Sequence, residues 1–196
     1  MQADHYQGID QIYTSEYKTS GSRFIGFLFP CDDPHSFEKS IKSYKEKFAD
    51  ATHICSACVI GVEREYQRCG DDGEPSNSSG RPILNTLLSK GITNVGCAVV
   101  RYYGGKKLGI PGLIEAYGGA AQLCIDQAEV INKTLEDSIV CSIPDDISYK
   151  LYNFLAKRTD VSYTISDSGQ FVLTCAKNLT PSLRTELKKI PNLAIE

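Results

Sequence analysis

The chain has 196 residues, a net charge of −3 and an ordinary share of apolar and charged residues. This length suits one large domain or two small ones, and the charge excludes the global basic field that drives bulk binding of nucleic acids. Any contact with phosphate must therefore come from a local basic patch. The first ten residues lack the basic and apolar regions of a signal peptide, and no apolar run approaches the roughly 20 residues of a membrane span. We therefore expect a cytoplasmic protein that does not bind membranes.

Strands and helices are predicted from residue 22 to residue 130. In chain order they are a strand at 22–31, a helix at 33–50, strands at 52–63 and 64–71, a helix from Pro82 to Gly91, a strand at 94–103 and a helix at 112–130. Asp33 and Pro34 supply the cap and the first position of the first helix. The apolar run at 94–103 is continuous, which is typical of a central strand.

The last 60 residues follow a different pattern. Their predicted elements are a strand at 137–143, a helix at 145–158, a hairpin at 161–176, a helix at 180–190 and a short strand at 192–196. The order βαββαβ is the ferredoxin-like arrangement. We therefore expect an α+β protein of two domains, residues 1–134 and 138–196, with a boundary near residues 132–138.

The eight cysteines do not indicate a disulfide framework, because a chain of this length can form a core without one. Most lie in apolar runs, where we expect reduced, buried thiols. Cys55 and Cys58 form a CxxC pair with His53 and Cys69 nearby. A structural zinc site needs a second well-spaced pair, which the sequence lacks. We expect no metal and no cofactor.

A basic, glycine-rich stretch, RYYGGKKLGIPGL at 101–113, connects the predicted central strand to the last helix of the first domain. Helix N-termini favour anions, and glycines let a phosphate approach the backbone. Lys106 and Lys107 would add positive charge beside such a site. The spacing matches neither GxxxxGK[ST] nor GxGxxG, so a mononucleotide enzyme is poorly supported. A structural turn with exposed lysines is an equally good interpretation.

An acidic stretch, DDGEPSNSSGRP at 71–82, is a loop by composition. Its carboxylates, Asp71, Asp72 and Glu74, could bind a hard cation or could cap their own turn. Arg101 could pair with one of them instead of contacting a ligand. Because both stretches precede helices, we expect them to form one cleft at an edge of the first domain. No Ser-His-Asp or Cys-His set suggests a catalytic site.

Four segments together resemble the IMPACT family, in particular its bacterial members. They are SRFIG at 22–26, ATHICSAC at 51–58, DDGEPSNSSGRPIL at 71–84 and VVRYYGGKKLGIPGLIEAYG at 99–118. The family pattern is closer to GEPSGTAG and KLGTGGL. Here Asn77 and Ser78 replace Gly-Thr, and Ile110 and Pro111 replace Thr-Gly.

The resemblance implies a first domain like the second domain of a small-subunit ribosomal protein, and a second domain like one in elongation factor G. Eukaryotic members regulate translation initiation by binding a ribosome-associated scaffold through a further N-terminal domain. The resemblance therefore does not imply this scaffold as a partner of the present chain. For this chain the implied role is translation-associated regulation without catalysis, by binding RNA or the ribosome. The residues implied in phosphate or RNA binding are Arg23, Arg81, Arg101, Lys106, Lys107, Gly104 and Gly105, with Asp71, Asp72 and Glu74 in the same cleft. The alternatives are a hydrolase that uses these carboxylates with Lys106, and a module that binds only a protein partner.

Overall fold

The computed structural model describes residues 5–196, so the start of the N-terminal stretch considered above, residues 1–4, lies outside the described residues. The chain divides into two compact units, one up to Lys133 and one from Thr134. Each unit combines antiparallel strands with helices. Within residues 5–196, no helix has the length and apolar character needed to cross a bilayer.

The first unit is built on a five-stranded antiparallel sheet with the order β2-β3-β6-β4-β5. Its strands are β2 (Tyr13–Thr19), β3 (Ser22–Pro30), β4 (His53–Ile60), β5 (Tyr66–Gly70) and β6 (Val95–Tyr102). β6 lies in the middle of the sheet, and seven of its eight residues are buried. The continuous apolar run that predicted a central strand is therefore explained by burial on both faces.

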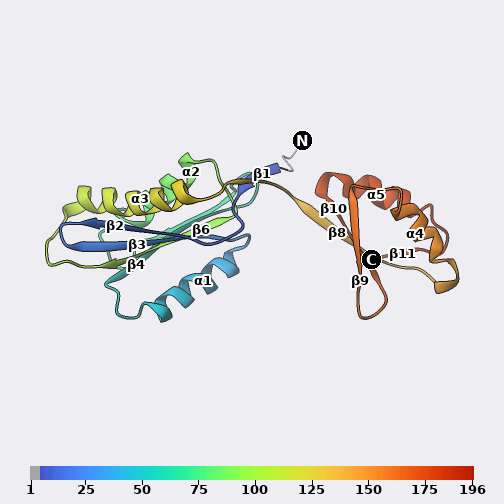
Figure 1. Ribbon diagram of the computed structural model, residues 1–196, viewed down its shortest axis with the longest axis horizontal. Coiled ribbons are helices and arrows are strands. Elements are labelled where there is room, and N and C mark those ends of the chain that lie inside the picture. Colours follow the sequence, from blue (N-terminus) through green and yellow to red (C-terminus); the bar gives the residue numbers. More distant parts are fainter. Residues whose placement is uncertain (1–4) are drawn as a thin grey trace. The chain divides into compact units, whose positions relative to one another are not determined.

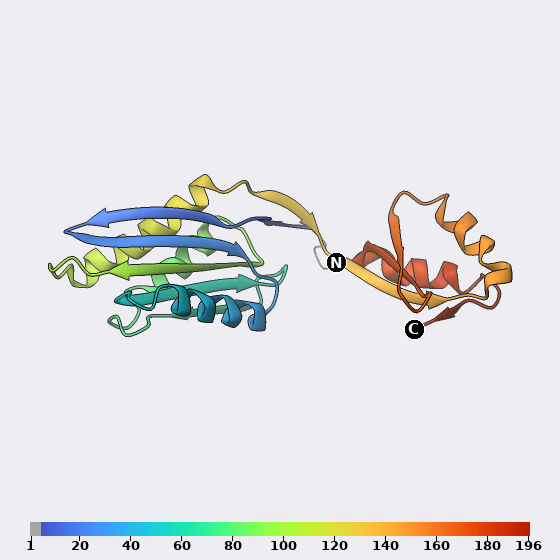
Figure 2. The same ribbon diagram turned by 60° about the horizontal axis from the view of Figure 1, so that its bottom comes forward.

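Three helices cover the two faces of this sheet (Figures 1 and 2). They are α1 (Pro34–Lys47) on one face, and α2 (Gly80–Ser89) and α3 (Gly109–Gln127) on the other. Residues such as Phe24, Leu87 and Tyr117 form the core beneath α2 and α3. A second core, which includes Phe37 and Val100, lies beneath α1. The sheet is therefore buried on both sides, as in a three-layer arrangement.

The predicted cap of helix α1 is present, whereas Thr180 lies inside α5 (Thr180–Leu187) and does not cap it. The side chain of Asp33 accepts hydrogen bonds from the backbone N–H groups of His35 and Ser36 at the start of α1. Along α3, Ala120 is fully buried, and its carbonyl oxygen lies only 3.0 Å from where a Cβ of Gly26 would be. The helix begins at Gly109, earlier than predicted from the sequence, because Pro111 needs no N–H partner in a first turn.

Three strands were not predicted from the sequence. β2 forms a hairpin with β3, and β1 (His5–Gly8) pairs with β7 (Ile131–Thr134) in a separate two-stranded sheet. These strands are short or mostly polar, so they lack a strong apolar signal. A weak signal for β2 was present in its alternating residues, YTSEYKT, followed by the Ser20-Gly21 turn.

The second unit has the predicted order of strand, helix, two strands, helix and strand. Its elements are β8 (Glu136–Ser142), α4 (Tyr149–Leu155), β9 (Val161–Ile165), β10 (Phe171–Ala176), α5 (Thr180–Leu187) and β11 (Ala194–Ile195). The strands form an antiparallel sheet with the order β11-β8-β10-β9. Short 3₁₀ turns, Asp145–Ile147 and Lys177–Leu179, precede the two helices. Leu151, Leu173 and Leu183 are fully buried in its separate core.

The eight cysteines, all within the described residues, are free thiols. Cys55 lies in the core under α2 and α3, whereas Cys58 lies in the core under α1. The CxxC pair occurs in strand β4, where residues three apart point to opposite faces. The two thiols therefore cannot act together, and burial raises the pKa of each to about 12.

Candidate functional site

The first carboxylate of the acidic loop, Asp71, caps helix α2 although it lies nine residues before the first residue of that helix, Gly80. Its Oδ1 accepts hydrogen bonds from the hydroxyl of Ser79 and the N–H of Gly80, and its Oδ2 accepts one from the N–H of Asn77. Burial opposes ionisation of Asp71, but the bonds from Ser79, Asn77 and Gly80 outweigh it and hold the pKa of this carboxyl below its ordinary value. Asp71 therefore fixes the loop and stabilises the start of α2.

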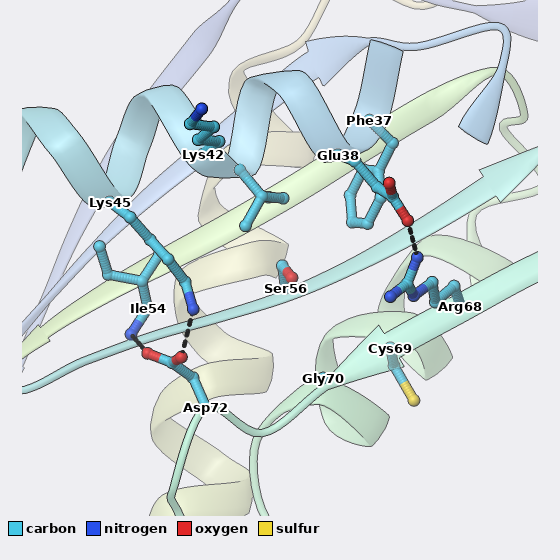
Figure 3. Close-up of a pocket in the computed structure, with 11 residues that line it drawn as sticks. Phe37, Glu38, Lys42, Lys45, Ile54, Ser56, Arg68, Cys69, Gly70 and Asp72 are labelled. Carbon is cyan, nitrogen blue, oxygen red and sulfur yellow. Dashed lines mark hydrogen bonds and ion pairs between the residues drawn. The ribbon is translucent and has the colours of Figure 1, made fainter. Parts of the chain in front are cut away.

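The second carboxylate, Asp72, is held from the side of the sheet that α1 covers. Its Oδ2 accepts the backbone N–H of Ile54 at 2.7 Å, and its Oδ1 binds the ammonium group of Lys45 (Figure 3). The residue adopts a left-handed conformation with φ of 45°. A cavity of about 370 Å³ lies here, between α1 and strands β4 and β5. Its rim also carries the ion pair between Arg68 and Glu38, shown in Figure 3.

The third carboxylate, Glu74, is buried with Arg101. Their side chains are only 4% and 7% exposed, and the guanidinium Nη1 donates to Glu74 Oε1. The hydroxyl of Tyr117 donates to the same oxygen at 2.8 Å. Burial, with Cys55 and Glu74 as neighbours, raises the pKa of the Tyr117 phenol, which therefore remains a donor. This buried set connects the acidic loop to strand β6 and helix α3.

The basic loop between β6 and α3 is anchored where it leaves the sheet. The N–H of Tyr103 donates to the hydroxyl of Thr52, and the N–H of Gly104 donates to the hydroxyl of Ser22. A Cβ atom at Gly104 would lie 1.8 Å from the carbonyl carbon of Gly21, so only glycine fits at this position. Close packing against Gly21 therefore explains the glycine at position 104 without any ligand.

The middle of the basic loop is exposed. Gly105 has a left-handed φ of 86°, with nothing near the position of a Cβ, so this glycine serves the turn. Lys106 and Lys107 are exposed, and neither ammonium group bonds to any residue from 5 to 196. Helix α3 follows at once, with no side-chain cap and no acidic residue in its first turn. The positive end of a 19-residue helix thus lies beside two unpaired cations.

A cavity of about 470 Å³ opens at this point, where the two loops meet. Its lining residues are Thr52, His53, Glu74, Pro75, Arg101, Tyr103, Lys107, Leu108, Gly109, Ile110 and Leu113. Tyr103, Leu108 and Leu113 supply apolar surface, whereas Lys107 supplies charge. Sequence reasoning missed Tyr103 as a site residue, although an aromatic residue directly before a glycine pair was a usable signal.

The structure brings together some of the predicted site residues and separates others. Glu74, Arg101 and Lys107 line the 470 Å³ cavity. Asp71, Asp72 and Lys106 do not line it. This differs from the single cleft that the sequence predicted, because Asp71 turns inward to cap α2 and Asp72 reaches the opposite face of the sheet.

The remaining predicted cations lie elsewhere in the first unit. Arg23, on β3, is paired with Glu16 across the hairpin. Arg81 is exposed in the first turn of α2, and its guanidinium bonds to no described residue. The alternative of a hydrolase that uses Asp71, Asp72 and Glu74 with Lys106 is not supported, because each of these carboxylates bonds to other groups of the protein. Across residues 5–196, no three His, Cys, Asp or Glu side chains form a group that could hold a metal ion.

Comparison with known proteins gives matches in the part of the chain that contains the acidic and basic loops. Residues 20–125 match the family model of the Impact N-terminal domain, which is more than half of the chain. The chain belongs to the IMPACT family.

Two bacterial members of the IMPACT family show the extent of the similarity. The chain is 38% identical over 115 residues to YigZ of Escherichia coli, covering 58% of this chain and 56% of that protein. It is also 38% identical over 114 residues to YvyE of Bacillus subtilis, covering 58% of this chain and 52% of YvyE. The chain thus spans about half the length of the curated relatives it matches.

Solved structures extend the likeness beyond the family domain. A crystal structure of a hypothetical protein matches 98% of this chain and 97% of its own length, with a TM-score of 0.75 and 26% identity. The two-domain translational regulator Yih1 matches 62% of this chain and 47% of its own length, with a TM-score of 0.38 and 22% identity. Only the first of these scores is high enough to equate the folds.

The departures from the usual IMPACT pattern have local explanations. Asn77, which replaces a glycine, has a φ of 61°, and asparagine is among the few residues that adopt this conformation readily. Pro111, which also replaces a glycine, lies in the first turn of α3 and lacks one of the N–H groups that would face an anion. The N–H groups of Gly109 and Ile110 remain in that turn.

Proposed function

We propose that this protein acts in translation-associated regulation by binding RNA, free or within the ribosome, through the basic loop before α3. The observation that carries the proposal is a pair of ammonium groups, Lys106 and Lys107, that bond to no described residue and lie beside an uncapped helix N-terminus. Elsewhere in the unit, acidic partners neutralise Arg23, Lys45 and Arg101. A pair of unneutralised lysines beside a positive helix end suits a polyanion such as RNA.

Membership of the IMPACT family supports a role in translation, since the resemblance implies regulation of initiation by eukaryotic members. The proposed likeness of the first unit to the second domain of a small-subunit ribosomal protein, and of the second unit to a domain of elongation factor G, points the same way. Fold analogy alone is a weak warrant for function, so the proposal rests chiefly on the basic loop.

The test is co-sedimentation of the full chain with purified ribosomes, with and without RNase treatment. We expect the wild type to sediment with ribosomes, and the Lys106→Ala/Lys107→Ala variant to remain largely in the supernatant. The matched control is Lys188→Ala/Lys189→Ala, which removes the same charge from an exposed lysine pair after α5. The proposal fails if the wild type does not sediment, or if the loop variant sediments as well as the control.

A further inference from the structure

The 470 Å³ cavity beside the basic loop combines apolar and cationic surface in a way that the proposed phosphate contacts do not use. Tyr103 is 45% exposed and Ile110 is 53% exposed, although both are large hydrophobic residues. Leu108 and Leu113 continue the apolar lining, and Lys107 lies at the same cavity. A volume of this size is in the usual range for sites that hold small organic ligands.

Arg101 provides an independent indication of a ligand. The residue is only 5% exposed, and its Nη1 binds Glu74, yet its Nε has no hydrogen-bond partner. Its guanidinium carbon lies 5.4 Å from the ring centroid of Tyr103. Buried donors in native proteins almost always have a partner, so an unpaired N–H on a residue that lines the cavity is unusual.

We propose that this cavity binds one nucleotide of single-stranded RNA, with the base against Tyr103 and a phosphate between Lys107 and the first turn of α3. This inference rests on the proposed function and specifies the ligand of the same site. Aromatic rings on which unpaired bases stack are a general feature of single-strand recognition. The first-turn N–H groups of Gly109 and Ile110, with Lys107, suit the phosphate. Arg101, whose guanidinium lies beside the ring of Tyr103, lines the same cavity.

The single-stranded form follows from the geometry of the ligand. A base within a duplex is already stacked and paired, and it cannot present a face to Tyr103 without leaving the helix. Because stacking does not release counterions, Tyr103 should affect affinity without changing its dependence on salt. The salt dependence of the affinity therefore distinguishes the contribution of Tyr103 from that of the exposed lysines.

The experiment measures binding of a fluorescent ten-nucleotide single-stranded RNA, and of its duplex, by anisotropy. We expect the wild type to prefer the single strand, and Tyr103→Leu to weaken single-strand binding about tenfold with an unchanged salt slope. Tyr103→Phe keeps the ring and should restore the affinity. The matched control is Tyr102→Leu, since Tyr102 packs on the α1 side of the sheet and donates to Asp50. Thermal melting of each variant confirms that it is folded.

The possible outcomes distinguish this inference from the proposed function. If Tyr103→Leu binds single strands as the wild type does, while Lys106→Ala/Lys107→Ala binds weakly, RNA contacts the loop but no base enters the cavity, and the inference is overturned. If the wild type binds neither RNA nor ribosomes, the proposed function itself fails. A second titration compares adenosine monophosphate with inorganic phosphate by NMR. Tighter binding of the nucleotide supports the inference, whereas equal affinities contradict it.

Discussion

The loops at residues 71–79 and 103–108 lead into adjacent helices of one unit, yet they use their charged groups in opposite ways. Every carboxylate of the acidic loop bonds to the protein: Asp71 to α2, Asp72 to Ile54 and Lys45, and Glu74 to Arg101. Both lysines of the basic loop lack such partners among residues 5–196. Charged residues in similar positions thus serve stability in one loop and remain available to a ligand in the other.

The largest effect is expected where the two loops meet, at the buried ion pair. Removing one partner leaves an uncompensated buried charge, so Arg101→Met or Glu74→Gln alone should lower the free energy of unfolding by about 3–5 kcal/mol. The variant with both changes retains an acceptor for Tyr117 and should lose less than the sum of the two. Urea unfolding of the full chain measures all three. Additive losses would show that the pair does not act as a unit.

A smaller loss is expected at the cap of α2. Asp71→Ala removes the acceptor for the N–H groups of Asn77 and Gly80, which should lower the free energy of unfolding by about 2 kcal/mol. Because the pKa of Asp71 is lowered in the folded state, its contribution is complete above the unfolded-state value of about 3.9 and is lost as the pH falls through the folded value. The difference between wild type and variant should therefore be constant above about pH 5 and shrink as the pH falls from there to below the folded value. A difference that grows on acidification would refute this role.

Asp72 should contribute less, because its ion pair with Lys45 is partly exposed. Asp72→Ala leaves the N–H of Ile54 without its acceptor and should cost about 1 kcal/mol of unfolding free energy. Lys45→Ala removes only the exposed ion pair and should cost less than that. Equal losses from the two variants, measured by urea unfolding, would mean that the hydrogen bond to Ile54 contributes nothing.

The smallest effect on stability is expected in the basic loop. Lys106→Ala/Lys107→Ala removes side chains that bond to no described residue, so the free energy of unfolding should stay within about 0.5 kcal/mol of the wild type. Thermal melting and urea unfolding are sufficient to measure this. A clear loss of stability would identify the lysines as structural and remove the contrast between the loops.

Much of the fold of the first unit could be predicted from local patterns. The apolar run of β6 indicated a central strand, and Asp33 indicated the start of α1, because both depend on neighbours in the sequence. Strands β1, β2 and β7 were missed, since their stability comes from pairing with other strands rather than from their own apolar content.

The candidate site could be predicted only in part. The sequence located both loops, and it left open the pairing of Arg101 with an acidic residue. It could not show that Asp72 would bind Lys45, because that contact depends on how α1 packs against the sheet. The role of Gly104 depends on its close approach to Gly21, which lies in the turn between β2 and β3. Such contacts join segments that are distant in the chain, and no local pattern specifies them.

The most direct test of the contrast between the loops is the affinity for single-stranded RNA as a function of salt concentration. If Lys106 and Lys107 each neutralise one phosphate, their replacement by alanine should reduce the slope of log K against log salt by about 1.4 in magnitude. Affinity should fall almost equally for different RNA sequences, and Lys188→Ala/Lys189→Ala should keep the wild-type slope. A loop variant with the slope and affinity of the wild type would contradict the account and leave the basic loop as a structural turn.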